Sequence, residues 1–88
     1  MTFILYWLID NDYKHTYVGF SDNIKRRIIE HKQGKVKTTK NFGRFKCFEL
    51  EKVSNIAEAR KREKYWKSHA GRKKLKEYFN KIKFAAIV

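Results

Sequence analysis

Five hydroxyl-bearing or ionisable side chains are expected on surfaces of this chain that face its interior. They come from separate segments of the sequence: Tyr6, Tyr17, Arg27, His31 and Glu63. A carboxylate among apolar neighbours must be paired, protonated or bound to a cation, because an isolated buried charge is costly. A hydrophobic core does not need such a convergence of polar groups, whereas a chemical site does.

Two segments near the N-terminus predict a β-hairpin. Residues 3–9 are all apolar, and five of the seven are β-branched or aromatic. Residues 14–20 include several strand formers, namely Thr16, Tyr17, Val18 and Phe20. A turn centred on Asn11-Asp12 would join the two strands.

The two tyrosines are expected to stand side by side on this hairpin. A two-residue or a four-residue loop gives the same register, in which Ile9 is opposite Lys14 and Tyr6 is opposite Tyr17. Directly opposite residues have Cβ atoms about 5 Å apart. Gly19 presents no side chain on that face, so the pair is expected beside a gap. The pattern is also that of an ordinary cross-strand aromatic pair with a strand-end glycine.

A helix that begins at a Ser21 or Asp22 cap and runs to about residue 33, with Gly34 as its stop, would carry the arginine and the histidine. At 100° per residue, Arg27 and His31 fall on the inward arc of this helix. That arc comprises Ile24, Arg27, Ile28 and His31. Arg27 can equally lie over the edge of the core or pair with an acid, and His31 taken alone suits a structural role.

The segment 34–43 is polar and basic, and a third strand is predicted from residue 44 to about 52. Lys37, Lys40 and Arg44 are candidates for phosphate contact, although a solvated connection has the same composition. Phe45, Cys47 and Glu49 should face one side of the strand, and Lys46, Phe48 and Leu50 the other. Cys47 is the only cysteine, and its apolar surroundings favour a thiol in the core.

A second helix should begin at Ser54 or Asn55, because Asn55 with Glu58 resembles a capping box. Glu63 is the single acid on the inward stripe of this helix, where a salt bridge is the simplest explanation for it. The stripe comprises Ile56, Ala59, Glu63, Trp66 and Ala70. Gly71 is expected to end the helix. A third helix over residues 72–83 would face inward with Leu75, Phe79 and Ile82.

The composition is that of a small basic protein. The chain has 88 residues, of which 42% are apolar, and a net charge of +13. Such a charge points to a polyanionic partner, with nucleic acid the first choice. The N-terminus lacks a basic lead, and its apolar run is too short to span a membrane. We therefore expect one α+β domain over residues 1–88, cytoplasmic, with a three-stranded antiparallel sheet flanked by about three helices.

The order of these residues resembles that of the GIY-YIG nuclease family, which includes the amino-terminal nuclease module of the bacterial excision-repair incision enzyme. The resemblance covers about residues 3–82 and rests on Ile4-Leu5-Tyr6, Tyr17-Val18-Gly19, Arg27, His31 and Arg62 to Trp66. Ile4 replaces the first glycine of the family motif. Many relatives also have a late asparagine; Asn80 is the nearest candidate, but no surrounding motif supports it.

The resemblance implies hydrolysis of a DNA phosphodiester with one divalent cation, Mg²⁺ or Mn²⁺, and a role in DNA repair or recombination. It implies that Arg27 binds the phosphate and that Glu63 is the metal ligand, while Gly19 is the motif glycine. Tyr6 is the predicted base, supported by Tyr17 and His31, although the opposite assignment of the tyrosines stays open. A tyrosine has a pKa of about 10, which surrounding cations should lower by favouring the phenolate.

Two other functions compete with the nuclease. One is a non-catalytic basic module on the same fold that binds DNA or RNA, and the other is a basic structural RNA-binding protein. Neither needs the set Tyr6, Tyr17, Arg27 and Glu63, which therefore favours the enzyme. No small-molecule cofactor is expected. The sequence gives no indication of oligomeric state or of the preferred DNA sequence.

Overall fold

The computed structural model describes residues 1–10, 15–40, 42 and 44–82, without the side chains of residues 38 and 79–82. In this part of the chain, three strands form an antiparallel sheet of order β2-β1-β3. The elements are β1 (Phe3–Asp10), β2 (Thr16–Ser21), α1 (Ile24–Lys32), the 3₁₀ turn η1 (Lys37–Thr39), β3 (Phe45–Val53), α2 (Ile56–Lys67) and α3 (His69–Ile82). The α+β prediction is confirmed.

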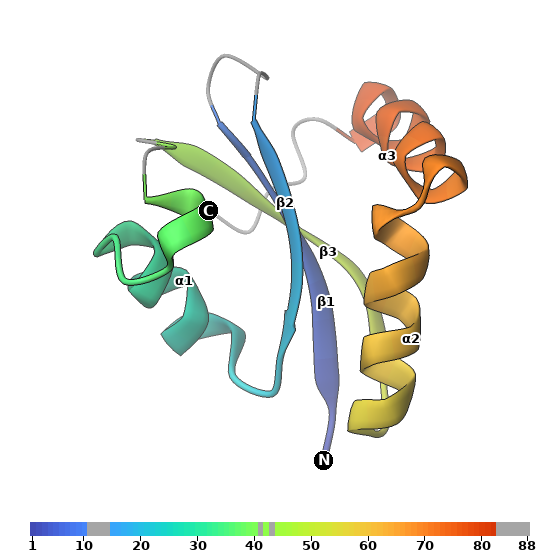
Figure 1. Cartoon of the computed structure of the whole chain (residues 1–88), viewed down its shortest axis with the longest axis horizontal. Coiled ribbons are helices and arrows are strands. Elements are labelled where there is room, and N and C mark those ends of the chain that lie inside the picture. The colour runs from blue at the N-terminus through green and yellow to red at the C-terminus, as the bar shows by residue number, and fades with distance from the viewer. Residues whose placement is uncertain (11–14, 41, 43, 83–88) are drawn as a thin grey trace.

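The central strand β1 is covered on both faces (Figure 1). Its apolar run alternates between two hydrophobic clusters, as successive strand residues must. One cluster joins the sheet to α2 and α3 through Trp66 and Leu75. The other contains Tyr6 and Leu8 and joins the sheet to α1 through Ile28. The edge strand β2 therefore lies between α1 on one side and α2 on the other, and both helices can present side chains beside it.

The hairpin register differs from the sequence prediction by two residues. Tyr6 pairs with Gly19 rather than with Tyr17, and Tyr17 pairs with Leu8. Because side chains alternate with a period of two, an even shift keeps both tyrosines on the same face. They are diagonal neighbours instead of direct partners.

The closing contacts of the hairpin are centred one residue later than the predicted turn. β1 ends at Asp10 and β2 begins at Thr16, whereas the predicted turn at Asn11-Asp12 lies outside the described residues. The backbone N–H of Asp10 donates to the carbonyl of His15 at 3.1 Å, and Nδ1 of His15 lies 2.8 Å from Oδ2 of Asp10. Asp10 and His15 thus form the pair next to Ile9 and Thr16 on the loop side, in the same register as the rest of the hairpin.

Helix α1 is capped by a polar side chain and is followed by Gly34, as predicted, but the capping residue lies one position later than Asp22. Asn23 caps the helix by accepting from the backbone N–H of Arg26 at 3.1 Å, in place of the predicted Ser21 or Asp22. Ser21 accepts in turn from the N–H of Asn23 at 2.9 Å. Gly34 follows the helix with φ of +73°, a conformation that glycine adopts without strain.

Strand β3 presents its side chains as predicted. Cys47 and Phe45 pack on the α1 side with Tyr6, while Phe48 packs on the α2 side. Cys47 is fully buried, and burial raises the pKa of its thiol to about 12. It is a core residue, as expected for an unpaired apolar-flanked cysteine.

Hydrogen bonds from two side chains of α2 to Glu51 of β3 hold the helix against the sheet. A carboxylate oxygen of Glu51 accepts from Nε of Arg62 at 2.9 Å and from the indole N–H of Trp66 at 2.6 Å. The Arg62 guanidinium also lies 4.5 Å from the ring centroid of Tyr65. Asn55 caps the helix as predicted, accepting from the N–H of Glu58 at 2.8 Å.

The predicted end of α2 is wrong. The helix ends at Lys67, and α3 begins at His69, so Gly71 lies inside the first turn of α3. Ala70 is therefore exposed on α3 instead of continuing the inward stripe of α2, and Ile56 at the other end of that stripe is 45% exposed. Leu75 is buried as predicted. The side chains of residues 79 and 82 lie outside the described part.

Gly71 is needed because two helices meet there. A Cβ atom at this position would overlap the carbonyl oxygen of Tyr65 and would lie 2.6 Å from Cα of Trp66. Both are backbone atoms, which cannot rotate away. We therefore expect Gly71→Ala to destabilise the fold by about 1–3 kcal/mol, as overpacking does. Thermal melts should show a Tm fall of roughly 4–24 °C, with Lys73→Ala on the exposed side of α3 as control. An unchanged Tm would contradict this packing.

Candidate active site

Two of the other predicted site residues, Arg27 and His31, meet at the hydroxyl of Tyr6. Its oxygen lies 2.8 Å from Nε2 of His31 and accepts from Nε of Arg27 at 3.3 Å. Tyr6 is fully buried. Burial raises the pKa of Tyr6 above its ordinary value, and the hydrogen bond from Arg27 offsets only part of this effect. Arg27 lowers the pKa of Tyr6 as predicted for a nearby cation, but burial outweighs it, so the predicted net lowering is wrong and Tyr6 is a neutral phenol at pH 7.

Tyr17 lies beside Tyr6 and shares its contacts. Their ring centroids are 6.1 Å apart, and the Tyr17 ring is 5.2 Å from that of His31. A Cβ atom on Gly19 would stand 2.7 Å from Oη of Tyr6 and 2.8 Å from Cε2 of Tyr17. The expected gap beside the pair is thus absent, because both rings lie over the glycine. Gly19 permits this close approach of the tyrosines to the β2 backbone.

Arg27 connects this cluster to the surface. Its side chain is 33% exposed, and its Nη1 donates to the Glu30 carboxylate at 3.3 Å. Burial lowers the pKa of Arg27, but hydrogen bonds with Tyr6, Glu30 and Tyr17 outweigh burial and raise it overall. Arg27 is therefore a permanent cation beside both tyrosines. The predicted inward orientation of Arg27 and His31 on α1 is confirmed.

His31 is held from both sides within the fold. Its Nδ1 lies 2.6 Å from Oγ1 of Thr39, and the Thr39 hydroxyl donates to the carbonyl of Val36 at 3.4 Å. With that hydroxyl proton engaged, Oγ1 accepts from Nδ1–H, which leaves Nε2 unprotonated to accept from Tyr6. Burial and the charge of Arg27 lower the pKa of His31 to about 4, whereas Glu30 opposes this shift. His31 is neutral at pH 7.

This lowered pKa predicts a loss of stability in acid. The unfolded chain takes up a proton on His31 near pH 6.5, whereas the folded chain does so near pH 4. Stability therefore falls as pH drops between these values, by about 3 kcal/mol in total. Urea unfolding at pH 7 and pH 4.5 should show a smaller pH effect for His31→Gln than for wild type. The exposed His69→Gln should behave as wild type, and an equal pH effect in all three proteins would contradict the prediction.

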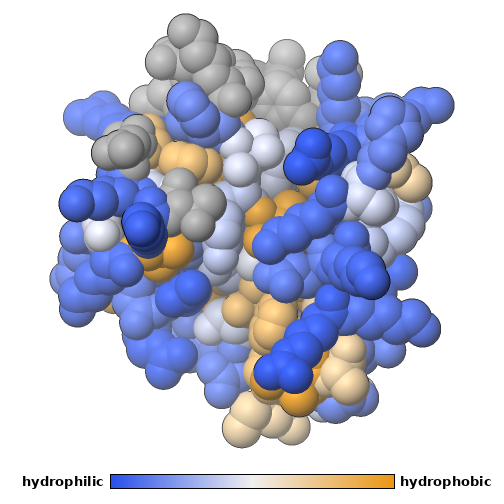
Figure 2. Space-filling model, viewed as in Figure 1, coloured by the Kyte–Doolittle hydropathy of each residue, from blue (hydrophilic) through white to orange (hydrophobic). Residues whose placement is uncertain are grey.

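Glu63 lies on α2, and Lys67 of the same helix links it to Tyr17 of the cluster. Its side chain is 27% exposed, and its carboxylate lies 3.4 Å from Nζ of Lys67. The same ammonium group lies 5.6 Å from the ring centroid of Tyr17. Figure 2 shows hydrophilic side chains over α1 and α2, with a paler and apolar strip along β2 between them. The predicted salt bridge of Glu63 is confirmed, and its partner is one helical turn away.

A comparison with protein families shows the family of this chain. Residues 2–78, nearly the whole chain, match the model of the GIY-YIG catalytic domain. The chain belongs to the GIY-YIG family. This membership indicates a nuclease-type function in general. No curated protein and no solved structure gives a significant match.

The divalent cation of this GIY-YIG domain stays a prediction, and Glu63 would be its single protein ligand. The described residues contain no group of three or more His, Cys, Asp or Glu side chains suited to a metal. Glu63 is accessible, and its pair with Lys67 is of the i,i+4 type that contributes only about 0.3–0.5 kcal/mol. Mg²⁺ commonly takes one or two carboxylates and completes its shell with water and phosphate oxygens.

The remaining predicted residues of the GIY-YIG domain lie on its surface. Lys37 and Lys40 are exposed on and after η1, and Arg44 is exposed just before β3. Their predicted contact with phosphate stays a prediction. The side chain of Asn80 lies outside the described part. No helix among the described residues is long and apolar enough to cross a membrane.

Two residues near the site were not singled out from the sequence. Thr39 is 2% exposed and holds His31, yet in the sequence it is one of several polar residues in a basic loop. Lys67 touches both Glu63 and Tyr17, and its spacing of four from Glu63 on a helix was the available signal.

Proposed function

We propose that this GIY-YIG domain hydrolyses phosphodiester bonds in DNA with the help of one divalent cation, Mg²⁺ or Mn²⁺. The observation that carries the proposal is the buried hydroxyl of Tyr6, which contacts both Arg27 and His31. Packing alone does not require a phenol, a guanidinium and an imidazole to converge. Phosphodiester hydrolysis needs an acceptor for the proton of water and a cation on the phosphate.

In the proposed mechanism, Arg27 binds a non-bridging phosphate oxygen through its solvent-facing N–H groups. This contact draws the guanidinium toward the substrate and uncovers the Tyr6 hydroxyl. Tyr6 then accepts a proton from the attacking water while it passes its own proton to Nε2 of His31. The raised pKa of Tyr6 disfavours a free phenolate. This proton relay from water through Tyr6 to His31 forms no free phenolate, because the two transfers occur together. Tyr17 keeps Tyr6 and Arg27 in place.

Glu63 would hold the cation on the other side of β2. When bound there, Mg²⁺ or Mn²⁺ would stabilise the charge that develops on the leaving oxygen. Lys67 has to release the carboxylate for this purpose. Its half-exposed ammonium can move into solvent at little cost because the pair with Glu63 is weak.

The same ion pair is the observation that favours a second function, a non-catalytic nucleic-acid-binding module. With Lys67 beside Glu63, the carboxylate already has a cationic partner. On this alternative, Arg27 and the surface lysines bind phosphate and no bond is broken. The two functions differ in whether a divalent cation produces cleavage.

A plasmid-nicking assay separates the two functions. We expect supercoiled DNA to be converted to nicked and linear forms with Mg²⁺ or Mn²⁺, and to stay supercoiled when the metal is chelated. The same samples should shift DNA in a gel with or without metal. Binding without cleavage at any metal concentration would exclude the nuclease and support the binding module.

Binding to DNA is expected to be largely electrostatic because the net charge of the chain is +13. Neutralising each phosphate releases counterions, so log affinity should fall with log salt by about 0.9 for each phosphate contacted. Fluorescence anisotropy with a labelled duplex over a range of salt concentrations measures this slope. An affinity that does not change with salt would contradict the prediction.

A further inference from the structure

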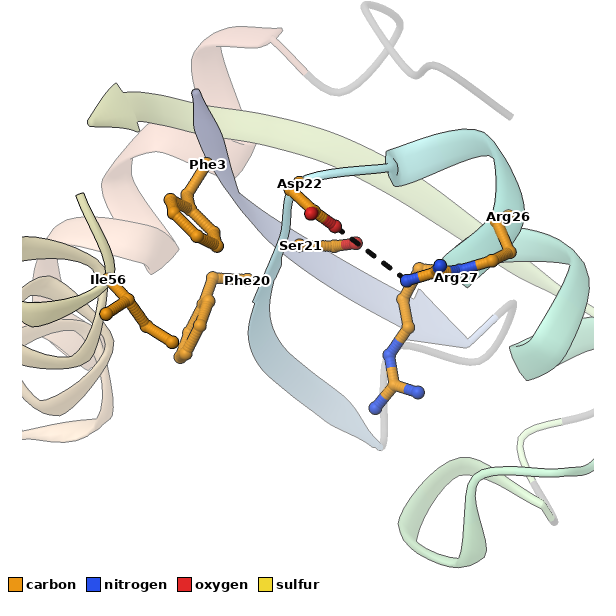
Figure 3. A pocket seen from close by; sticks show the side chains of 7 residues that line it. All are labelled: Phe3, Phe20, Ser21, Asp22, Arg26, Arg27 and Ile56. Carbon is orange, nitrogen blue, oxygen red and sulfur yellow. Dashed lines mark ion pairs between the residues drawn. The ribbon is translucent and has the colours of Figure 1, made fainter. Parts of the chain in front are cut away.

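A groove lies at the C-terminal end of β2, where this strand leads into α1 (Figure 3). Its volume is about 380 Å³. Seven residues line it: Phe3, Phe20, Ser21, Asp22, Arg26, Arg27 and Ile56. Arg27 therefore belongs both to this groove and to the candidate active site.

The two sides of the groove differ in chemistry. Phe3, Phe20 and Ile56 gather on one side, and the two arginines lie on the other (Figure 3). The phenylalanine rings meet edge to face, with centroids 6.0 Å apart, and neither ring is fully buried. Phe20 packs partly against the core that the sheet shares with α2 and α3, and Ile56 is 45% exposed, so a partly exposed apolar surface lies next to two cations.

An unpaired nucleotide matches both sides of this groove. Its phosphate is an anion for Arg27, and its base has an aromatic face that stacks on protein rings irrespective of sequence. The base of a fully paired duplex is already stacked and lies within the helix. Arg26 stands at the rim and pairs with Asp22 at 3.8 Å. Because this pair is long and exposed, the arginine stays available to a second phosphate.

We propose that this groove binds an unpaired nucleobase, stacked on Phe20, next to the phosphate held by Arg27. The substrate class is then single-stranded nucleic acid or a duplex that is locally unpaired at the cleavage position. This inference rests on the proposed function for the role of the phosphate. Binding to the groove nevertheless does not depend on cleavage and is measurable without metal.

The test compares two labelled single strands of equal length and charge, one of thymidines and one of abasic residues. Anisotropy is measured in chelator. Stacking on an aromatic side chain contributes about 1–3 kcal/mol per base, so wild type should bind the thymidine strand about 5- to 150-fold more tightly. Phe20→Leu keeps an apolar side chain but removes the flat ring, and should lose most of this preference while binding the abasic strand as wild type does.

Ile29→Ala is the matched control, because Ile29 is a large exposed apolar residue of α1 that does not line the groove. It should keep the wild-type preference. If thermal melts show that Phe20→Leu does not fold, Phe20→Met, which also lacks the flat ring, replaces it. Equal binding of the two strands by wild type, or an unchanged preference in the folded variant, would overturn the proposal. A preference without cleavage would refute only the proposed nuclease.

Discussion

Replacing Tyr6 with phenylalanine is expected to slow metal-dependent DNA cleavage by about 10²- to 10⁴-fold, the range of general acid–base catalysis. The ring remains, so the packing against Gly19 and Tyr17 is kept. The lost hydroxyl leaves Nε2 of His31 and Nε of Arg27 without this contact. Its loss should cost about 1–3 kcal/mol of folding stability. Single-turnover rates and thermal melts measure the two effects separately.

Tyr17→Phe is the matched control for this result. Tyr17 contacts Arg27 and the rings around it, but Tyr6 alone reaches Nε2 of His31 among the described residues. Tyr17→Phe should therefore slow cleavage less than Tyr6→Phe does. If Tyr17→Phe is the more damaging change, the roles of the two tyrosines are exchanged. If neither variant is slowed tenfold, the proposed relay is wrong.

The sequence predicted the layers of the fold well because the local patterns are strong. Apolar runs bounded by polar residues located the three strands, and the inward arc of α1 placed Arg27 and His31 correctly. The hairpin register was missed because the turn was centred on Asn11-Asp12, whereas the contact between Asp10 and His15 centres it one residue later. The contact between Asp10 and His15 involves side chains that no local pattern pairs.

The end of α2 was missed for a different reason. Glycine often follows the end of a helix, so Gly71 was taken as a stop signal. It is instead the point of closest approach between α3 and the last turn of α2. Local sequence cannot separate these two uses of glycine, because the second depends on the crossing of two helices in space.

The sequence predicted which residues form the candidate site better than it predicted their surroundings and pKa values. Tyr6 and Arg27 were identified, but the sign of the Tyr6 pKa shift depends on how far burial outweighs the nearby cation. Thr39 comes from a 3₁₀ turn with no periodicity to place its side chain inward. Both features depend on three-dimensional packing, of Tyr6 in the core and of the loop on α1, which a linear pattern does not encode.

Replacing Glu63 with glutamine is expected to abolish metal-dependent cleavage while DNA binding and folding persist. The amide keeps the size of the side chain but lacks the negative charge that attracts a divalent cation. Folding should persist because the carboxylate is partly exposed and its pair with Lys67 is weak. Glu58→Gln, an exposed acid in the first turn of the same helix, is the matched control and should cleave as wild type does.

The most direct measurement is single-turnover cleavage of one labelled DNA by wild type, Glu63→Gln and Glu58→Gln over a titration of Mn²⁺. Protein is in excess, and circular dichroism confirms that all three are folded. The account predicts metal-dependent product with wild type and Glu58→Gln, and none with Glu63→Gln at any metal concentration. Equal cleavage by Glu63→Gln and wild type, or product from wild type in chelator, would contradict it.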